Sequence, residues 1–133
     1  MLLTRASEYA LLSLIVLAKA DKPMDSETLS KELDISKSFL AKILQSLARN
    51  DIIVSRKGVN GGFALHEHSK KKTILQIMCA VEGKNPAVFE CSPSMNDCPS
   101  DNASTCKIWP FINKLQLKID AFLGTLTLND ILE

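Results

Sequence analysis

The chain has 133 residues, of which 46% are hydrophobic and 23% are charged. This length suits one domain with a core of its own, and the composition excludes a disordered chain. A net charge of +1 neither favours nor excludes nucleic acid as a partner, so the distribution of charge has to decide. Between Lys31 and Lys72 there are nine lysines and arginines but only four aspartates and glutamates, so the basic charge gathers in the middle third.

An apolar run from Leu11 to Ala18 superficially resembles the core of a signal peptide. Glu8 lies just before it, and the run is only eight residues long and includes Ser13, which fits an amphipathic or buried helix at least as well. Nothing in the chain approaches the ~20 apolar residues of a membrane span. We therefore expect a cytoplasmic protein without a membrane partner. In that reducing compartment, clustered cysteines bind metal more often than they form disulfides.

Two helices are predicted at the start of the chain. The first spans about residues 5–20, because Pro23 shortly afterwards blocks its continuation. The second begins near Ser26, whose hydroxyl can cap the free N–H groups of a first turn. Leu29 and Leu33 then lie four residues apart on one face of this short helix.

A third helix follows after a tight link. Ser36 offers its cap, and the helix is expected to end near residues 49–50. Its apolar residues recur at helical spacing: Phe39, Leu40, Ile43, Leu44 and Leu47. Two short helices joined in this way predict a helix-turn-helix.

A β-hairpin is predicted next. Residues 52–57 are β-branched and then basic, and the apolar residues 63–66 follow after a glycine-rich tip at 58–62. A basic hairpin directly after a helix-turn-helix predicts a winged helix, in which one helix enters the major groove while the wing contacts the backbone or the minor groove. The expected fold class is mainly α with a small β-hairpin wing.

The second half of the chain is predicted to hold one short helix and a long loop. The helix covers about residues 73–81 and is closed by Gly83. Residues 85–107 have no sustained period and contain three of the four cysteines. An irregular loop of this length in a small domain needs something to order it.

A long helix is predicted from Ile108 to about residue 124, followed by a short turn over 126–132. Its apolar stripe consists of Ile108, Ile112, Leu115, Ile119 and Phe122. The predicted organisation is a winged-helix DNA-binding domain (1–83), a cysteine-bearing loop (84–107), and a dimerisation helix with a C-terminal turn (108–133).

The loop cysteines are the candidate metal ligands. Six residues separate Cys91 from Cys98 and seven separate Cys98 from Cys106, so the C-x2-C pair of a structural zinc site is missing. Such wide spacing suits an iron–sulfur cluster, and it suits free or oxidised cysteines equally well. Cys79 lies in an apolar helical pattern, where a cysteine usually acts as a small buried hydrophobe.

The candidate DNA contacts lie on the third helix and the hairpin. They are Ser36, Lys37, Ser38, Phe39 and Lys42 on the helix and Arg56, Lys57, Asn60, Gly61 and Gly62 on the wing. The last three carry no charge, so they predict a close approach of the wing backbone to DNA. Core packing is an equal alternative for Phe39.

Two further observations concern chemistry. His66 and His68 are expected on one face of the return strand, where a solvated or phosphate-contacting pair is more common than a metal site. No serine, cysteine or carboxylate constellation suggests catalysis, so we do not expect an enzyme.

In their order along the chain, these pieces resemble the IscR/NsrR family of small, dimeric winged-helix transcription regulators. The matching pieces are Leu3-Thr4, Tyr9-Ala10, Ser36-Lys37-Ser38-Phe39-Leu40, Gly58-Val59-Asn60-Gly61-Gly62-Phe63, the three-cysteine loop, Trp109 and Leu126-Thr127-Leu128. The resemblance implies a homodimer on a pseudo-palindromic site in double-stranded DNA. It also implies an iron–sulfur cluster, [2Fe-2S] or [4Fe-4S], on the three cysteines.

The same resemblance implies a fourth ligand. IscR-like members have a histidine three residues after the third cysteine, where this chain has Trp109. NsrR-like members use a carboxylate early in the first helix of the other subunit, and Glu8 stands at the matching place. As an alternative, Glu8 is a first-turn carboxylate favoured by the helix dipole, worth at most about 1 kcal/mol. Because it leads an apolar stripe, we expect it to face the interior, where an unpaired carboxylate is costly.

The sequence therefore predicts a DNA-binding transcription regulator whose operator binding is controlled by an iron–sulfur cluster, similar to sensors of nitric oxide, redox state or iron–sulfur status. Two alternatives remain open. One is a cluster-free regulator that uses thiol redox chemistry or zinc. The other is an iron–sulfur accessory protein whose winged helix binds protein instead of DNA.

Overall fold

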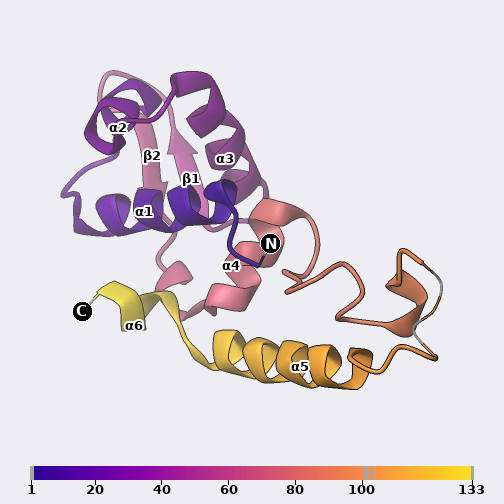
Figure 1. The fold of residues 1–133 in the computed structure, drawn as a ribbon. Helices are drawn as coiled ribbons and strands as arrows, with labels where there is room; N and C mark the ends of the chain where they lie inside the picture. Colours follow the sequence, from indigo (N-terminus) through magenta and orange to yellow (C-terminus); the bar gives the residue numbers. More distant parts are fainter. Residues whose placement is uncertain (1, 101, 103, 133) are drawn as a thin grey trace.

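A computed structural model of the protein describes residues 2–100, 102 and 104–132. It confirms a mainly α fold with one small antiparallel hairpin (Figure 1). The elements are α1 (Arg5–Lys19), α2 (Ser26–Leu33), α3 (Lys37–Arg49), β1 (Ile53–Arg56), β2 (Gly62–Leu65), α4 (Ile74–Glu82), α5 (Trp109–Thr125) and α6 (Leu128–Leu132), with short 3-10 turns at Ser69–Lys71 and Met95–Asp97. None of the helices in the described ranges is both long and apolar enough to cross a membrane.

Helix α1 lies at the centre of the core and packs against α2, α3, α4, α6 and β2. Its buried face combines small and large side chains: Ser7, Ala10, Ser13, Leu14 and Leu17. The Ser13 hydroxyl donates to the carbonyl of Tyr9 at 2.7 Å, so burying it leaves no unmet hydrogen bond. Small residues on this face let the neighbouring helices approach α1 closely.

Helices α2 and α3 form the predicted helix-turn-helix. The cap of α2 is Asp25, not Ser26, because the Asp25 carboxylate accepts the backbone N–H of Thr28 at 2.6 Å. Hydrogen bonds from the backbone and the side chain of Thr28 hold the pKa of Asp25 below its usual value. Asp34 ends α2 in the left-handed conformation (φ 54°), and Ser36 then caps α3 as predicted.

The wing contains more than the predicted hairpin. In β1 and β2 the register pairs Ile53 with Leu65 and Arg56 with Gly62. Met24, in the link before α2, pairs with the outer edge of β2: its N–H donates to the Phe63 carbonyl at 2.9 Å and its carbonyl accepts the Phe63 N–H at 2.7 Å. The wing is therefore fastened to the start of the helix-turn-helix.

This attachment explains Gly62. Its φ is +137°, a conformation that side chains disfavour, and a Cβ at this position would lie 2.5 Å from both the carbonyl carbon and the carbonyl oxygen of Met24. Neither backbone can withdraw without breaking the hydrogen bonds between Met24 and Phe63. Only glycine fits here.

The chain returns to the core after α5. The N–H of Ile74 donates to the Leu126 carbonyl at 2.7 Å, the N–H of Leu128 donates to the Lys72 carbonyl at 2.9 Å, and the Leu128 side chain is fully buried. Figure 1 shows α5 running below α4, with the segment between them projecting away from the winged-helix domain. The cysteine loop is therefore tied at both ends to helices that pack on one another.

Replacing Gly62 by alanine should lower the free energy of unfolding by about 2 kcal/mol or more, because the new methyl group meets the Met24 backbone in a strained conformation. Gly124→Ala is the matched control. Gly124 lies inside α5, and its added Cβ would meet the Leu75 side chain at an ordinary 3.8 Å. Gly124→Ala should raise the free energy of unfolding by about 0.5–1 kcal/mol, because alanine has a higher helix propensity than glycine. Urea unfolding monitored by circular dichroism measures both, and equal stabilities for the two variants would contradict this account of the wing.

Candidate functional site

The outer face of α3 presents polar and basic side chains. Lys37, Ser38 and Lys42 are exposed, and Ser36 accepts the backbone N–H of Phe39 at 3.3 Å. The opposite face is buried through Leu40, Ile43, Leu44 and Leu47. The core thus fixes α3 with its predicted contact residues turned outward.

Phe39 belongs partly to the core. Its ring is half-buried and meets the ring of Tyr9 from α1 edge-on, with the centroids 5.7 Å apart and an interplanar angle of 84°. This contact supports the packing alternative for Phe39 and ties the first turn of α3 to α1.

The wing places its basic residues at the surface. Arg56, Lys57 and Asn60 are exposed, and the side chain of Val59 at the tip is fully open to solvent. A groove joins this tip to the link before α2; its lining includes Met24, Asp25, Thr28, Val59, Asn60 and Gly61. The tip and the turn between α2 and α3 lie toward the same end of the molecule, at the top of Figure 1.

Contacts within the chain explain why the adjacent wing positions 61 and 62 are both glycine. A Cβ on Gly61 would lie 2.4 Å from the carbonyl oxygen of Arg56, and the Gly61 N–H closes the turn onto the Gly58 carbonyl at 2.9 Å. Gly62 is required by its contact with Met24. The geometry of the wing itself accounts for both glycines, and their close approach to DNA stays a prediction.

The paired histidines follow the return strand. Their ring centroids lie 5.1 Å apart, the backbone N–H of His68 donates to Nδ1 of His66 at 3.3 Å, and His68 lies 3.4 Å from the carboxylate of Glu67. Among the residues with described positions, they join no group of three metal-ligating side chains. Because β2 ends at Leu65, the two histidines do not lie on the return strand, where we expected them.

Cys91, Cys98 and Cys106 are free thiols, each partly exposed. Three thiols in one loop are chemically suited to an iron–sulfur cluster. In a single protomer, however, the described residues gather no group of three ligating side chains. Three thiolates are suitable ligands for an iron–sulfur cluster. The loop would have to bring the three cysteines closer together to bind one.

Helix α5 holds residues 86–92, the first arm of this loop, through a row of polar side chains that the sequence reasoning missed. The Trp109 indole N–H donates to the Cys91 carbonyl at 2.8 Å, and the Asn113 amide donates to the Ser92 carbonyl at 2.9 Å. Gln116, one turn further on, bonds to residues 86 and 88. The positions 109, 113 and 116 lie on one helical face, which was the available signal.

Cys79 differs from the buried hydrophobe that we predicted. It is partly exposed, and its thiol donates to Oδ1 of Asn85 at 2.9 Å. Partial burial, with a smaller contribution from the Asp120 carboxylate on α5, raises the pKa of the Cys79 thiol. It therefore stays protonated and weakly nucleophilic near neutral pH.

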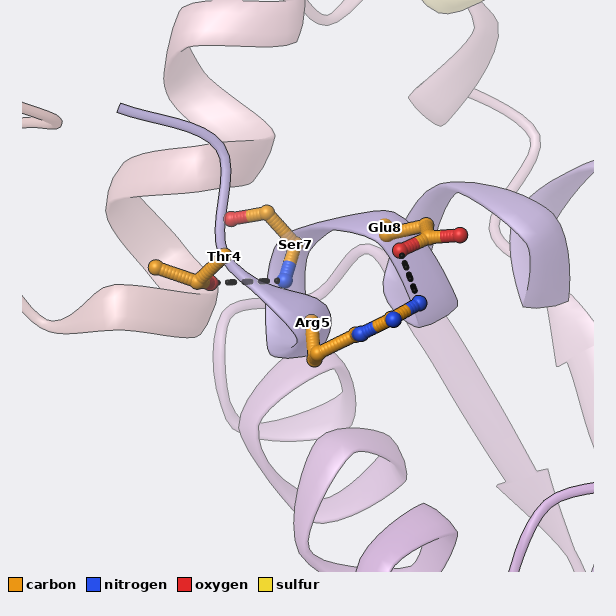
Figure 2. Close-up of polar contacts among 4 residues, drawn as sticks. All are labelled: Thr4, Arg5, Ser7 and Glu8. Atoms are coloured by element: carbon orange, nitrogen blue, oxygen red, sulfur yellow. Dashed lines mark hydrogen bonds and ion pairs between the residues drawn. The ribbon is translucent and has the colours of Figure 1, made fainter. Parts of the chain in front are cut away.

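Glu8 does not face the interior as expected. Figure 2 shows its carboxylate beside the Arg5 guanidinium, with Nη1 and Oε2 3.2 Å apart, and the Glu8 side chain is 43% exposed. The interior face of α1 passes through Ser7, Ala10 and Leu14, and each helical residue turns about 100° from the last. Glu8 therefore lies beside that face and can be reached from outside the protomer.

The carboxylate that does reach the start of α1 is Glu82, the last residue of α4. Its Oε1 accepts hydrogen bonds from the hydroxyls of Thr4 and Ser7, the latter at 2.9 Å. The Thr4 hydroxyl also accepts the Ser7 N–H at 3.2 Å, which caps α1 (Figure 2). This contact joins the N-terminal turn of α1 to the helix that leads into the cysteine loop.

Comparison with known proteins gives a family match over nearly the whole chain. A family model described as Rrf2, iron-dependent transcriptional regulator, matches residues 3–133. The helix-turn-helix transcriptional regulator IscR of Xenorhabdus nematophila is 24% identical over 135 residues, which cover 100% of this chain and 80% of that protein.

Solved structures share the fold. CymR of Bacillus subtilis, titled the global cysteine regulator, superposes with a TM-score of 0.72 at 20% identity and covers 99% of this chain and 96% of its own. IscR of T. potens superposes with a TM-score of 0.71 at 18% identity, covering 99% and 86%. The winged-helix architecture is therefore common to this chain and to both regulators.

Proposed function

The chain belongs to the Rrf2 family of transcriptional regulators, and we propose that an iron–sulfur cluster on Cys91, Cys98 and Cys106 controls its affinity for operator DNA. One observation carries the proposal. The three thiols lie on a loop fastened to α5, α5 packs on α4, and α4 packs on both α1 and the recognition helix α3. A change in the loop thus has a continuous path of packed elements to the DNA-binding surface.

The DNA-binding part of the proposal rests on the exposed residues of α3 and the wing. Ser38 and Lys42 are exposed on α3 and would read base edges from a helix in the major groove, and the exposed Lys37 lies beside them. Arg56 and Lys57 supply positive charge for phosphates next to the groove.

A homodimer is proposed on the outer face of α5. Four large apolar side chains of this region are more than half exposed: Ile108, Phe111, Leu117 and Phe122. At about 100° per residue, Ile108, Phe111 and Phe122 lie within about 60° of one another around the helix axis, whereas Leu117 lies on another side. Exposed apolar side chains that share a face mark an interaction site, and a second copy of the same helix would cover them symmetrically. Two-fold symmetry would present two recognition helices to a pseudo-palindromic operator.

The dimer also gives Glu8 a role as the fourth ligand, offered to the partner's cysteines. Its exposed position supports this, because a second protomer can approach the carboxylate directly. A bound iron–sulfur cluster, [2Fe-2S] or [4Fe-4S], would supply a group sensitive to oxidants and nitric oxide. The residues of this chain hold that group and connect it to α5.

A thiol switch without a cluster is the second candidate. Two observations favour it: all four cysteines are free, and the described residues assemble no metal-ligating group in one protomer. The two candidates differ in whether the isolated protein carries iron and sulfide.

The wing assignment predicts the salt dependence of DNA binding. The double variant Arg56→Gln/Lys57→Gln should bind an operator fragment more weakly, and the slope of log K against log salt should fall by about two units, since each phosphate contact contributes about 0.9. Fluorescence anisotropy at four salt concentrations measures this. Lys19→Gln/Lys84→Gln, which removes two exposed charges outside α3, the wing and α5, is the charge-matched control and should leave the slope unchanged. An unchanged slope in the wing variant would show that these side chains do not contact phosphates.

The cluster assignment predicts which cysteines matter. Protein purified without oxygen should contain iron and sulfide and absorb visible light. Cys91→Ala, Cys98→Ala and Cys106→Ala should each abolish the chromophore, while Cys79→Ala, which removes a thiol bonded to Asn85, should keep it. Full iron content in the triple alanine variant would rule out the cluster. Iron-free wild-type protein whose DNA affinity responds reversibly to oxidation would establish the thiol switch instead.

Glu8 is tested by comparing it with its ion-pair partner. Glu8→Gln should make the cluster labile and reduce the difference in DNA affinity between cluster-loaded and cluster-free protein, whereas Arg5→Gln should do neither. Both variants break the same exposed ion pair, worth under about 1 kcal/mol of stability, so their folding should be equal. Absorbance decay in air and operator affinity at fixed salt provide the measurements. Identical behaviour of the two variants would show that Glu8 is only the ion-pair partner of Arg5 and not a cluster ligand.

A further inference from the structure

We infer that Gln116 is a positioning residue that holds Cys91 as the fixed member of the three-thiol set, so that Cys98 and Cys106 are brought to it. The inference rests on the proposed function of the loop and adds a division of labour among its thiols. It comes from the hydrogen bonds that anchor one arm of the loop and not the other.

Gln116 is a buried amide on α5 that hydrogen-bonds the backbone at the root of the loop. Only 2% of its surface is exposed. Its Oε1 accepts the backbone N–H of Val88 at 2.8 Å, and its Nε2 donates to the Pro86 carbonyl at 3.0 Å and to Oδ1 of Asp120 at 2.8 Å. A buried amide satisfied by backbone groups holds that backbone, because breaking the contacts leaves polar atoms without partners.

The same face of α5 extends the clamp to the first cysteine. Trp109 holds the Cys91 carbonyl and Asn113 holds the Ser92 carbonyl, so three side chains fasten residues 86–92 along the helix. Ser92 is fully buried, and its hydroxyl bridges both backbone groups of Phe89. The backbone of Cys91 is thereby fixed relative to α5.

The second arm is held only by itself. Over its described residues, 93–100, 102 and 104–107, every hydrogen bond joins two residues of the arm. One of them is the Asn102 N–H donating to Sγ of Cys98 at 3.4 Å. Cys98 and Cys106 therefore lie on a stretch whose described residues can reposition without breaking a hydrogen bond to α5.

This asymmetry gives the clamp a function. Gathering three ligands around one group costs conformational freedom. The cost is smaller when one of the three ligands already has a fixed position. The fixed thiol is also the one whose backbone bonds to α5. Closure of the free arm onto Cys91 would thus act directly on α5 through Trp109 and Gln116.

The first test uses the full chain without a cluster. Hydrogen exchange measured by NMR should show the Val88 amide protected and the amides of residues 94–107 exchanging faster. Gln116→Met, which keeps the size of the side chain and removes its hydrogen bonds, should speed Val88 exchange about tenfold. Lys114→Met, on the exposed side of α5, should leave it unchanged. Wild-type Val88 exchanging as fast as the free arm would overturn the inference.

The second test follows the cluster. Gln116→Met should lose it about tenfold faster in air than wild type, the usual scale for residues that orient a ligand. Trp109→Phe, which keeps an aromatic side chain but removes the indole N–H that holds the Cys91 carbonyl, should act in the same direction if Gln116→Met folds poorly. Equal rates of cluster loss in wild type and in a folded variant with an unprotected Val88 would overturn the positioning role. Wild-type protein without iron and sulfide overturns the proposed function alone, since the exchange test still decides whether the clamp exists.

Discussion

The structure depends on the close packing of α1 against α3 and α4. Ala10 and Leu14 are fully buried at this junction, and the small side chains of Ser7 and Ser13 beside them keep the helices near one another. Protein interiors are packed so densely that neighbouring helices shift together or repack in discrete steps. Helix α3, which we propose enters the major groove, and helix α4, which leads into the cysteine loop, therefore share α1 as a rigid neighbour. Any displacement of α4 must be accommodated by α1 and by α3, since α4 packs on both of them.

Local signals in the sequence predicted the helices well, because caps act over three or four residues. Ser36 and Gly83 sit where the pattern placed them, at the start of α3 and the end of α4. The cap of α2 was misassigned by one position, since Asp25 and Ser26 are both able to cap and only the turn geometry chooses between them. The wing glycines were recognised as special, but the constraint on them from inside the chain was missed. What requires Gly62 is Met24, which is remote in sequence and close in space.

The candidate site was less predictable, because its contacts join distant parts of the chain. The interior face of α1 could not be identified from apolar residues, since these surround much of the helix; the small residues Ser7 and Ala10 marked it instead. Glu8 was consequently placed inside, and the role of Glu82 at the start of α1 was missed. The bond between Gln116 and Val88 spans 28 positions. A glutamine in an amphipathic helix gives no local sign of such a partner.

The sensing role that we propose for the cysteine loop requires that the loop be only half fixed. A loop held along its whole length would cost little to close, but no ligand state could then move it. A loop held nowhere would lose so much conformational freedom on binding that its ligand would be weakly held. Here Trp109 and Gln116 hold the arm with Cys91, and the rest of the loop bonds only to itself within its described residues. The held arm lies on α5, the same helix whose exposed apolar face is proposed to meet a second protomer, so closure of the free arm would act where the spacing of two recognition helices is set.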